Sequence, residues 1–128
     1  MLFRSLTDVG KILFISSIPD WKFVSSWYTD LSKTKAKADY EVKEALDELF
    51  SGKKNLTQLQ KAKMIYQYIV ENVRYSSVSF RQSGYIPQKA TTTLNTKLGD
   101  CKDVSTLFAA MCKESGINAS LKIGRAHV

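Results

Sequence analysis

Long apolar runs are absent from this sequence of 128 residues, and this bears first on the class of protein. The apolar run at residues 12–15 has the length of a strand, whereas a membrane-spanning helix needs about 20 apolar residues. No extended apolar stretch follows Arg4, so no signal peptide is recognised. There is also no internal repeat and no low-complexity tract. We therefore expect no membrane span. Hydrophobic residues make up 44% of the chain, which is enough for a folded core.

Cysteine and histidine are scarce: the chain has two cysteines and one histidine. Cys101 and Cys112 would share one face of a helix, but they would lie about 16 Å apart along its axis. A disulfide requires Cα atoms within about 7 Å, so the two thiols are predicted to be free. Their spacing is not that of a metal site either. The sequence therefore predicts no metal and no other cofactor.

Acidic residues are outnumbered by basic ones, 12 against 19, which gives a net charge of +7. Such an excess can reflect a nucleic acid, an anionic surface or an acidic substrate as partner. The lysines are spread over several segments, at Lys33, Lys35, Lys37, Lys53, Lys54, Lys61 and Lys63. They form no single stripe with interleaved aromatic residues, so a solvated surface explains them better. We expect no nucleic-acid partner, and salt-dependent binding to any DNA would contradict this.

Apolar periodicity predicts a short strand at residues 11–16 and then three helices. The first helix has its start signal at Ser17-Ile18-Pro19-Asp20, with the proline near the first turn, and an aromatic-rich stripe that we expect to pack in the core. The second follows a lysine-rich break and ends near Gly52. The third begins at Thr57, with Gln60 completing a capping box, and runs to about residue 73. The three predicted stripes are Trp21, Val24, Trp27, Tyr28 and Leu31; Val42, Ala45, Leu46, Leu49 and Phe50; and Leu59, Ala62, Ile65, Tyr66, Ile69 and Val73.

Residues 75–99 change in character, because serines, threonines, glycines and Pro87 replace the helical periodicity. This predicts an extended, loop-rich passage, and a loop of such length in a compact domain is usually functional or poorly ordered. A further helix then begins near Cys101 and ends at Gly116. Beyond it, apolar and polar residues alternate from Ala119 to Ile123, which predicts a strand.

The start of that last helix carries the chemistry. Asp100 is predicted to cap its N-terminus, with Asp103 in the first turn. Cys101 would lie in the first turn and in register with Val104 and Phe108, on the stripe that faces the core. A thiol at a helix N-terminus, pointed inward, has the placement that activates nucleophilic cysteines.

Placement alone does not activate this thiol. A helix terminus stabilises a nearby negative charge by about 0.3–1 kcal/mol at exposed sites. A tenfold change in the ionisation equilibrium of the thiol requires about 1.36 kcal/mol, so the helix alone supplies less than this. A partner cation is needed, normally an imidazolium. His127 is the only histidine, and a returning strand would bring it back towards Cys101. It is a candidate base or an incidental residue near the chain end.

Here the sequence resembles the transglutaminase core of bacterial proteins. The matching features are Gly-Asp-Cys-Lys-Asp at residues 99–103, the apolar helix behind it, and the turn at residues 116–119 into a strand. Residues 69–75 and 84–87 also resemble the approach to that core, so the likeness covers residues 57–126. The helix at residues 21–31, with its Ile-Pro-Asp-Trp start, resembles the helix that precedes the core in larger bacterial members.

The resemblance implies a papain-like α+β fold with few strands in this part, and a Cys-His-Asp triad with Cys101 as nucleophile. It implies acyl transfer or hydrolysis at an amide of a protein or peptide substrate, and a periplasmic or secreted location. In the family the histidine and aspartate follow the strand predicted here, so we expect a truncated domain that is inactive in isolation. Residues 1–56 would be a strand and helical lead-in, and residues 57–128 the N-terminal half of the core. Helix faces left exposed by such truncation predict self-association.

Two further questions have alternative answers. The backbone N–H of Cys101 is a sensible oxyanion donor, and Tyr75 and Gln88 are both candidates for the second, although ordinary loop polarity also explains them. The domain as a whole is expected to be a cysteine peptidase, amidase or transglutaminase. The alternative is a non-catalytic binding or scaffold module that keeps the fold.

Overall fold

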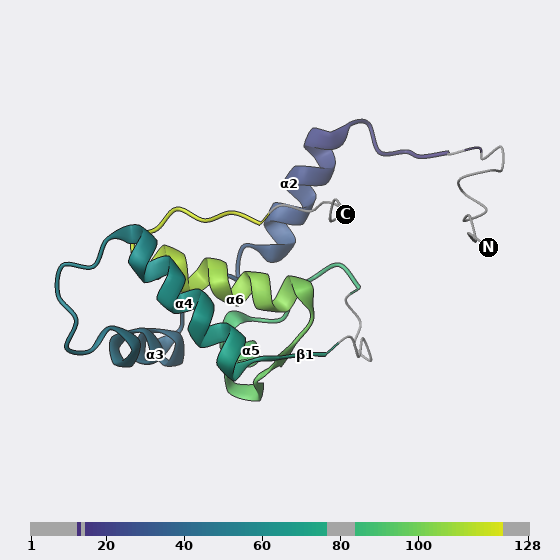
Figure 1. Ribbon diagram of the computed structural model, residues 1–128. Coiled ribbons are helices and arrows are strands. Elements are labelled where there is room, and N and C mark those ends of the chain that lie inside the picture. Colours follow the sequence, from purple (N-terminus) through teal and green to yellow (C-terminus); the bar gives the residue numbers. More distant parts are fainter. Residues whose placement is uncertain (1–12, 14, 77–83, 122–128) are drawn as a thin grey trace, which may run out of the picture.

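The computed structural model describes residues 13, 15–76 and 84–121 (Figure 1). Over these residues it contains five helices and one sheet of two parallel strands. The helices are α2 (Trp21–Ser32), α3 (Tyr40–Phe50), α4 (Gln58–Asn72), α5 (Ala90–Thr96) and α6 (Cys101–Glu114), and the strands are β1 (Arg74–Tyr75) and β2 (Leu98–Gly99). The predicted α+β class with few strands is confirmed.

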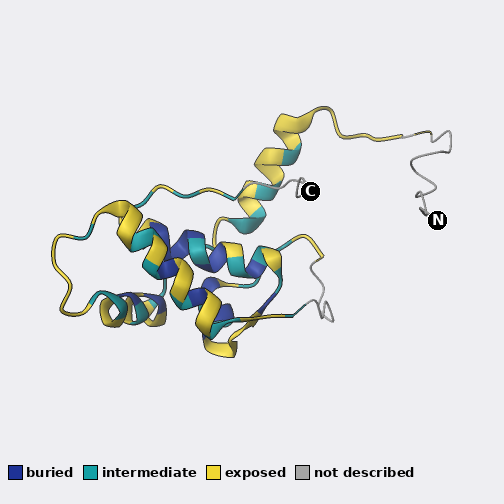
Figure 2. Ribbon diagram, viewed as in Figure 1, coloured by how far each residue is buried: buried dark blue, intermediate teal, exposed yellow. Residues whose placement is uncertain are grey.

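The core forms where α3, α4 and α5 pack around α6 (Figure 2). Its main side chains are those of Val42, Leu46, Ile65, Ile69, Leu94, Leu107 and Met111. The stripes predicted for α3 and α4 supply four of these residues, because apolar side chains three or four positions apart share one face of a helix. Two members of the α4 stripe were predicted wrongly. Leu59 and Tyr66 are exposed, since the other helices cover α4 on one side only.

Local sequence fixes the ends of these helices. At the start of α4, the Thr57 side chain accepts a hydrogen bond from Gln60 N at 3.2 Å, and Thr57 N donates to Gln60 Oε1 at 2.9 Å. The predicted capping box is therefore confirmed. After α3, Gly52 has a φ of +72°, a left-handed backbone conformation that residues other than glycine rarely adopt.

The pairing of the two strands brings the end of α4 next to the start of α6, because β1 follows α4 and β2 precedes α6. β1 pairs with β2 in parallel, with Arg74 opposite Leu98 and Tyr75 opposite Gly99. Arg74 N donates to Lys97 O at 2.9 Å and Ser76 N donates to Gly99 O at 3.0 Å. The pairing holds β2, which ends two residues before Cys101, next to the start of α6.

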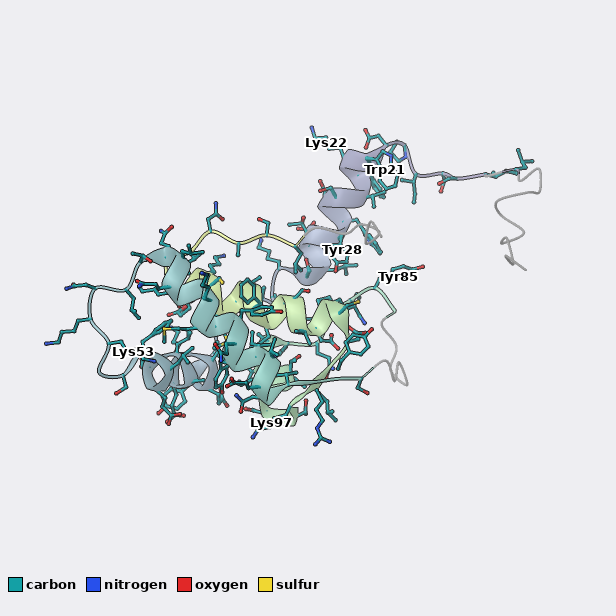
Figure 3. All side chains as sticks on the ribbon, in the orientation of Figure 1. Trp21, Lys22, Tyr28, Lys53, Tyr85 and Lys97 are labelled. Carbon is teal, nitrogen blue, oxygen red and sulfur yellow. The ribbon has the colours of Figure 1, made fainter. Side chains whose placement is uncertain are left out.

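The aromatic helix α2 differs from the prediction. It begins at Trp21 with Asp20 as its N-cap, at the end of the predicted start signal, but none of its residues is buried. Trp21 is 85% exposed and Trp27 is 48% exposed. In Figures 1 and 3, α2 lies outside the group of helices α3 to α6, and Trp21 points away from that group. The expectation that these aromatic residues pack in the core is wrong for the described structure, which offers them no partner surface.

The loops also differ from the predictions. The passage at residues 75–99 contains the end of β1, all of α5 and all of β2. The predicted strand at residues 11–16 lies partly outside the described residues, and Leu13, Ile15 and Ser16 are not in a strand. Residues 117–121 are not in a strand either, and the rest of that predicted strand is outside the described part. Among the helices described, none is long and apolar enough to cross a membrane.

Candidate active site

The N-terminus of α6 presents Cys101 as its first residue. Asp100 is the N-cap, and its Oδ1 accepts hydrogen bonds from Lys102 N at 3.0 Å and Asp103 N at 3.2 Å. The predicted cap is confirmed, together with a capping box that Asp103 completes. Caps of this kind satisfy N–H groups that a helix end leaves unpaired.

Cys101 is exposed, so the prediction that it points into the core is wrong. Helix side chains tilt towards the N-terminus of their helix. The side chain of the first residue therefore extends beyond the N-terminal end of the helix, whereas Leu107 and Met111, further along α6, are fully buried. The thiol lies at the surface, where another molecule can reach it.

Lys102 forms an ion pair with Asp100 beside the thiol. Burial alone would raise the pKa of the Asp100 carboxyl, but hydrogen bonds from Lys102 and from two backbone N–H groups outweigh it and hold the pKa below its ordinary value. Burial would lower the pKa of the Lys102 ammonium, yet the bond to Asp100 raises it above the usual value. A negative charge at Cys101 contributes to that increase. Lys102 thus carries its cation one residue after the thiol, in the first turn of α6.

Asp103 lies below the cap and is only 4% exposed. Its Oδ1 accepts from Gln88 N at 2.8 Å, and its Oδ2 accepts from Gln88 Nε2 at 3.0 Å and from Asp100 N at 3.2 Å. One carboxylate thus joins the segment before α5 to the first turn of α6. Asp103 was predicted only as an acidic residue of the first turn, and its bonds to Asp100 N and to Gln88 were not predicted. Its signal was a second acidic residue in the first turn, at a position that faces the core.

The structure places both candidates for the second oxyanion donor beside the start of α6. Tyr75 is opposite Gly99 in the strand pair, and its side chain is exposed. Gln88 is hydrogen-bonded to Asp103 through its backbone and its side chain. His127 is outside the described residues. The site as described therefore brings Cys101, Lys102, Asp103, Tyr75 and Gln88 to one end of α6.

Gly99 is a further residue that the sequence analysis did not single out for the site. A Cβ atom at this position would lie 2.9 Å from Asp103 Cβ and 3.0 Å from Thr93 Cγ2. Real side chains do not pack so closely, so only glycine allows β2 to approach α5 and α6 here. The glycine that precedes Asp100 in the motif therefore has a packing role directly behind the thiol.

The second thiol has the opposite environment. Cys112 is 1% exposed in the middle of the core, and burial raises its pKa. Both cysteines are free. Over the part of the chain that the structure describes, no three His, Cys, Asp or Glu side chains gather as metal ligands would.

An apolar groove of about 330 Å³ runs along α6 between α4 and residues 119–121. Its apolar lining includes Tyr66, Val70, Val104, Phe108 and Leu121. Ser105, four residues after Cys101, also lines the groove, and residues four apart share a helix face. The groove therefore begins about one helical turn from the thiol.

Comparison with known families decides the identity of this motif. A family model described as the transglutaminase-like superfamily matches residues 43–127. The chain belongs to the transglutaminase-like superfamily. No curated protein and no solved structure matches. The transglutaminase-like match includes most of α3 and all of α4 to α6, and it relates the chain to cysteine-dependent acyl transfer or hydrolysis at amides. The division predicted after residue 56 stays a prediction.

Proposed function

We propose that Cys101 is the nucleophile of a transglutaminase-like enzyme that transfers or hydrolyses the acyl group of an amide in proteins or peptides. The observation that supports this best is an exposed thiol on the first residue of α6, a helix whose N-terminus carries a capping box. The thiol lies within the sequence Gly-Asp-Cys-Lys-Asp. The match at residues 43–127 supports the same chemistry. A purely structural cysteine would instead be buried and inert, as Cys112 is.

The reaction begins with attack of the Cys101 thiolate on the substrate carbonyl carbon. A C–S bond forms, and the carbonyl electrons move to oxygen, where the backbone N–H of Cys101 stabilises the negative charge. Collapse of this intermediate breaks the C–N bond: the leaving nitrogen takes a proton from a general acid, expected to be an imidazolium, and departs as an amine, while the acyl group stays on Cys101 as a thioester. Water or a second amine then takes the acyl group and restores the thiol.

The thiolate needs more support than the helix gives. The helix terminus supplies about 0.3–1 kcal/mol, and Lys102 adds a nearby positive charge that is shared with Asp100. The catalytic base is expected to be an imidazole, because cysteine nucleophiles usually pair with one. His127 stays a candidate for this role.

The test measures whether folding activates Cys101. In a Cys112→Ala variant, the rate of iodoacetamide labelling at neutral pH would be compared between the folded chain and the same chain in urea. We expect labelling to be several-fold faster in the folded chain, because the cap, Lys102 and the helix terminus exist only there. A Cys101→Ser variant controls for Cys112, whose labelling should be slower when folded. Equal or slower labelling of folded Cys101 would contradict the proposal.

The apolar groove favours one alternative, a non-catalytic binding module. In that case a partner would occupy the groove, and Cys101 would be dispensable. Cys101→Ser and Phe108→Ser distinguish the two functions, because a binding module should be impaired by the second substitution only. An enzyme should lose turnover with the first.

A further inference from the structure

The Asp103 carboxylate is buried more deeply than its place in a helix cap requires. A charge removed from water is stable only where hydrogen bonds replace the lost hydration. Asp103 is 4% exposed, and three N–H groups donate to it. A cap needs only the bond from Asp100 N. The two bonds from Gln88 therefore hold another segment against the nucleophile's helix.

These bonds fix the position of the Gln88 side chain. Gln88 Nε2 and Asp100 N both donate to Asp103 Oδ2, so they lie within two hydrogen-bond lengths of each other. Asp100 N is one residue from the backbone N–H of Cys101, which has no hydrogen-bond partner among the described residues. Gln88 is thus beside the group that would bind the oxyanion.

The same bonds fix the orientation of the amide. An ionised carboxylate only accepts hydrogen bonds, so it selects the NH2 end of the glutamine side chain. That NH2 has two N–H groups, of which Asp103 uses one. The second is available to another acceptor. Tyr75 has no such support, because it is 66% exposed and no described residue hydrogen-bonds its phenol.

We propose that Gln88 is the second oxyanion donor and that Asp103 is the positioning residue that holds it. This assignment rests on the proposed role of Cys101. In the intermediate, the oxyanion would accept from Cys101 N and from the free N–H of Gln88, while Asp103 keeps the glutamine amide oriented. Preorganised donors of this kind are effective because they do not have to reorient during the reaction.

Two electrophiles separate this role from a structural one. Iodoacetamide alkylates a thiolate with loss of iodide and forms no oxyanion. p-Nitrophenyl acetate acylates it: sulfur attacks the carbonyl, the electrons move to oxygen, and collapse expels p-nitrophenolate to leave an acetyl thioester. The ratio of the acylation rate to the alkylation rate at Cys101 therefore reports on the oxyanion donors. Both rates would be measured on the full chain carrying Cys112→Ala.

Gln88→Ala should lower that ratio about tenfold or more, since loss of one oxyanion donor costs about 10²–10³ in a natural protease. Alkylation should change by less than about twofold, since it forms no charge on oxygen. Asp103→Asn should lower the ratio as well, because its amide group would no longer accept both bonds from Gln88. Gln67→Ala is the matched control, since Gln67 lies exposed on α4 and hydrogen-bonds Glu71.

Each outcome is decisive. A ratio unchanged in Gln88→Ala overturns the inference, even if Asp103→Asn fails to fold. A ratio lowered by Tyr75→Phe instead would assign the donor to Tyr75 and also overturn it. If Cys101 reacts no faster in the folded chain than in urea with either electrophile, the proposed function fails. Fast alkylation with an unchanged ratio leaves the proposed function in place and removes only this inference.

Discussion

Gly99 shows how one missing side chain shapes the site. Its backbone lies against Asp103 and Thr93 at distances that leave no space for a Cβ atom. The atoms it would meet are the Cβ of Asp103, close to the α6 backbone, and a methyl of the buried Thr93. Neither is the end of a flexible chain that could move aside. The thiol's position therefore depends on a residue that has no side chain of its own.

Gly99→Ala should consequently lower the free energy of unfolding by about 1–3 kcal/mol, the usual cost of overpacking a close contact. It should also slow Cys101 acylation, because the start of α6 must shift to accept the methyl group. Urea unfolding measures the first effect and the p-nitrophenyl acetate rate the second. Gly84→Ala is the control, since nothing lies within 4 Å of its added Cβ. Equal stability of the two variants would show that the contact at Gly99 relaxes easily.

At the scale of the element, the Asp100 cap links the stability of α6 to pH. Burial alone would raise the pKa of this carboxyl, but its hydrogen bonds with Lys102 and with backbone N–H groups lower it. The folded chain therefore binds a proton at Asp100 more weakly than the unfolded chain does. The stabilisation is present above the unfolded pKa, and it is lost as the pH falls through the folded pKa.

We expect the Tm measured by thermal denaturation to fall as the pH is lowered below about 5, and Asp100 should contribute to this fall. Asp100→Asn keeps a good cap residue but removes the charge, so its Tm should depend less on pH. Asp100→Ala removes the cap as well and should cost about 1 kcal/mol at neutral pH. If the asparagine variant kept the full acid dependence, other carboxylates would have to be its source.

Local signals in the sequence predicted the ends of the helices well and their surroundings less well. Thr57 and Asp100 begin α4 and α6 as predicted, because a cap depends only on residues two or three positions apart. The helix α5 was missed, since it is short, rich in β-branched threonine and lacks a capping hydrogen bond. No local signal indicated it.

The candidate site followed the same rule. The position of Cys101 at a helix start was predictable from its neighbours. Its exposure was not, because register along a helix says which residues share a face and not what covers that face. The bond from Gln88 to Asp103 joins residues fifteen positions apart across α5, so only the assembled structure could reveal it.

On the scale of the whole molecule, two stretches of uncovered apolar surface stand out among the described residues. One is α2, with Trp21, Phe23 and Trp27 exposed, and the other is the groove along α6. Patches of this kind commonly mark interaction surfaces. We therefore expect the chain to self-associate, as its helical stripes predict, with α2 as the main contact.

Light scattering over a range of concentrations would measure this association. The mass should rise above that of a monomer as the concentration increases. Trp21→Ser with Trp27→Ser should shift the transition to higher concentration or abolish it, whereas Tyr85→Ser, at an exposed aromatic residue outside α2 (Figure 3), should not. A monomer at high concentration would rule out self-association.

The parallel pairing of β1 with β2 has a consequence for the order of folding. The α6 cap uses neighbours in sequence, so it can form as soon as the helix does. The bonds of Arg74 and Ser76 to Lys97 and Gly99 instead join segments on either side of α5, and such contacts require a loop to close first. We expect Cys101 to acquire its helix early and its surroundings last. Its enhanced reactivity would then appear only when α3 to α6 have assembled. In a partly folded chain, Cys101 would have the reactivity of an ordinary thiol.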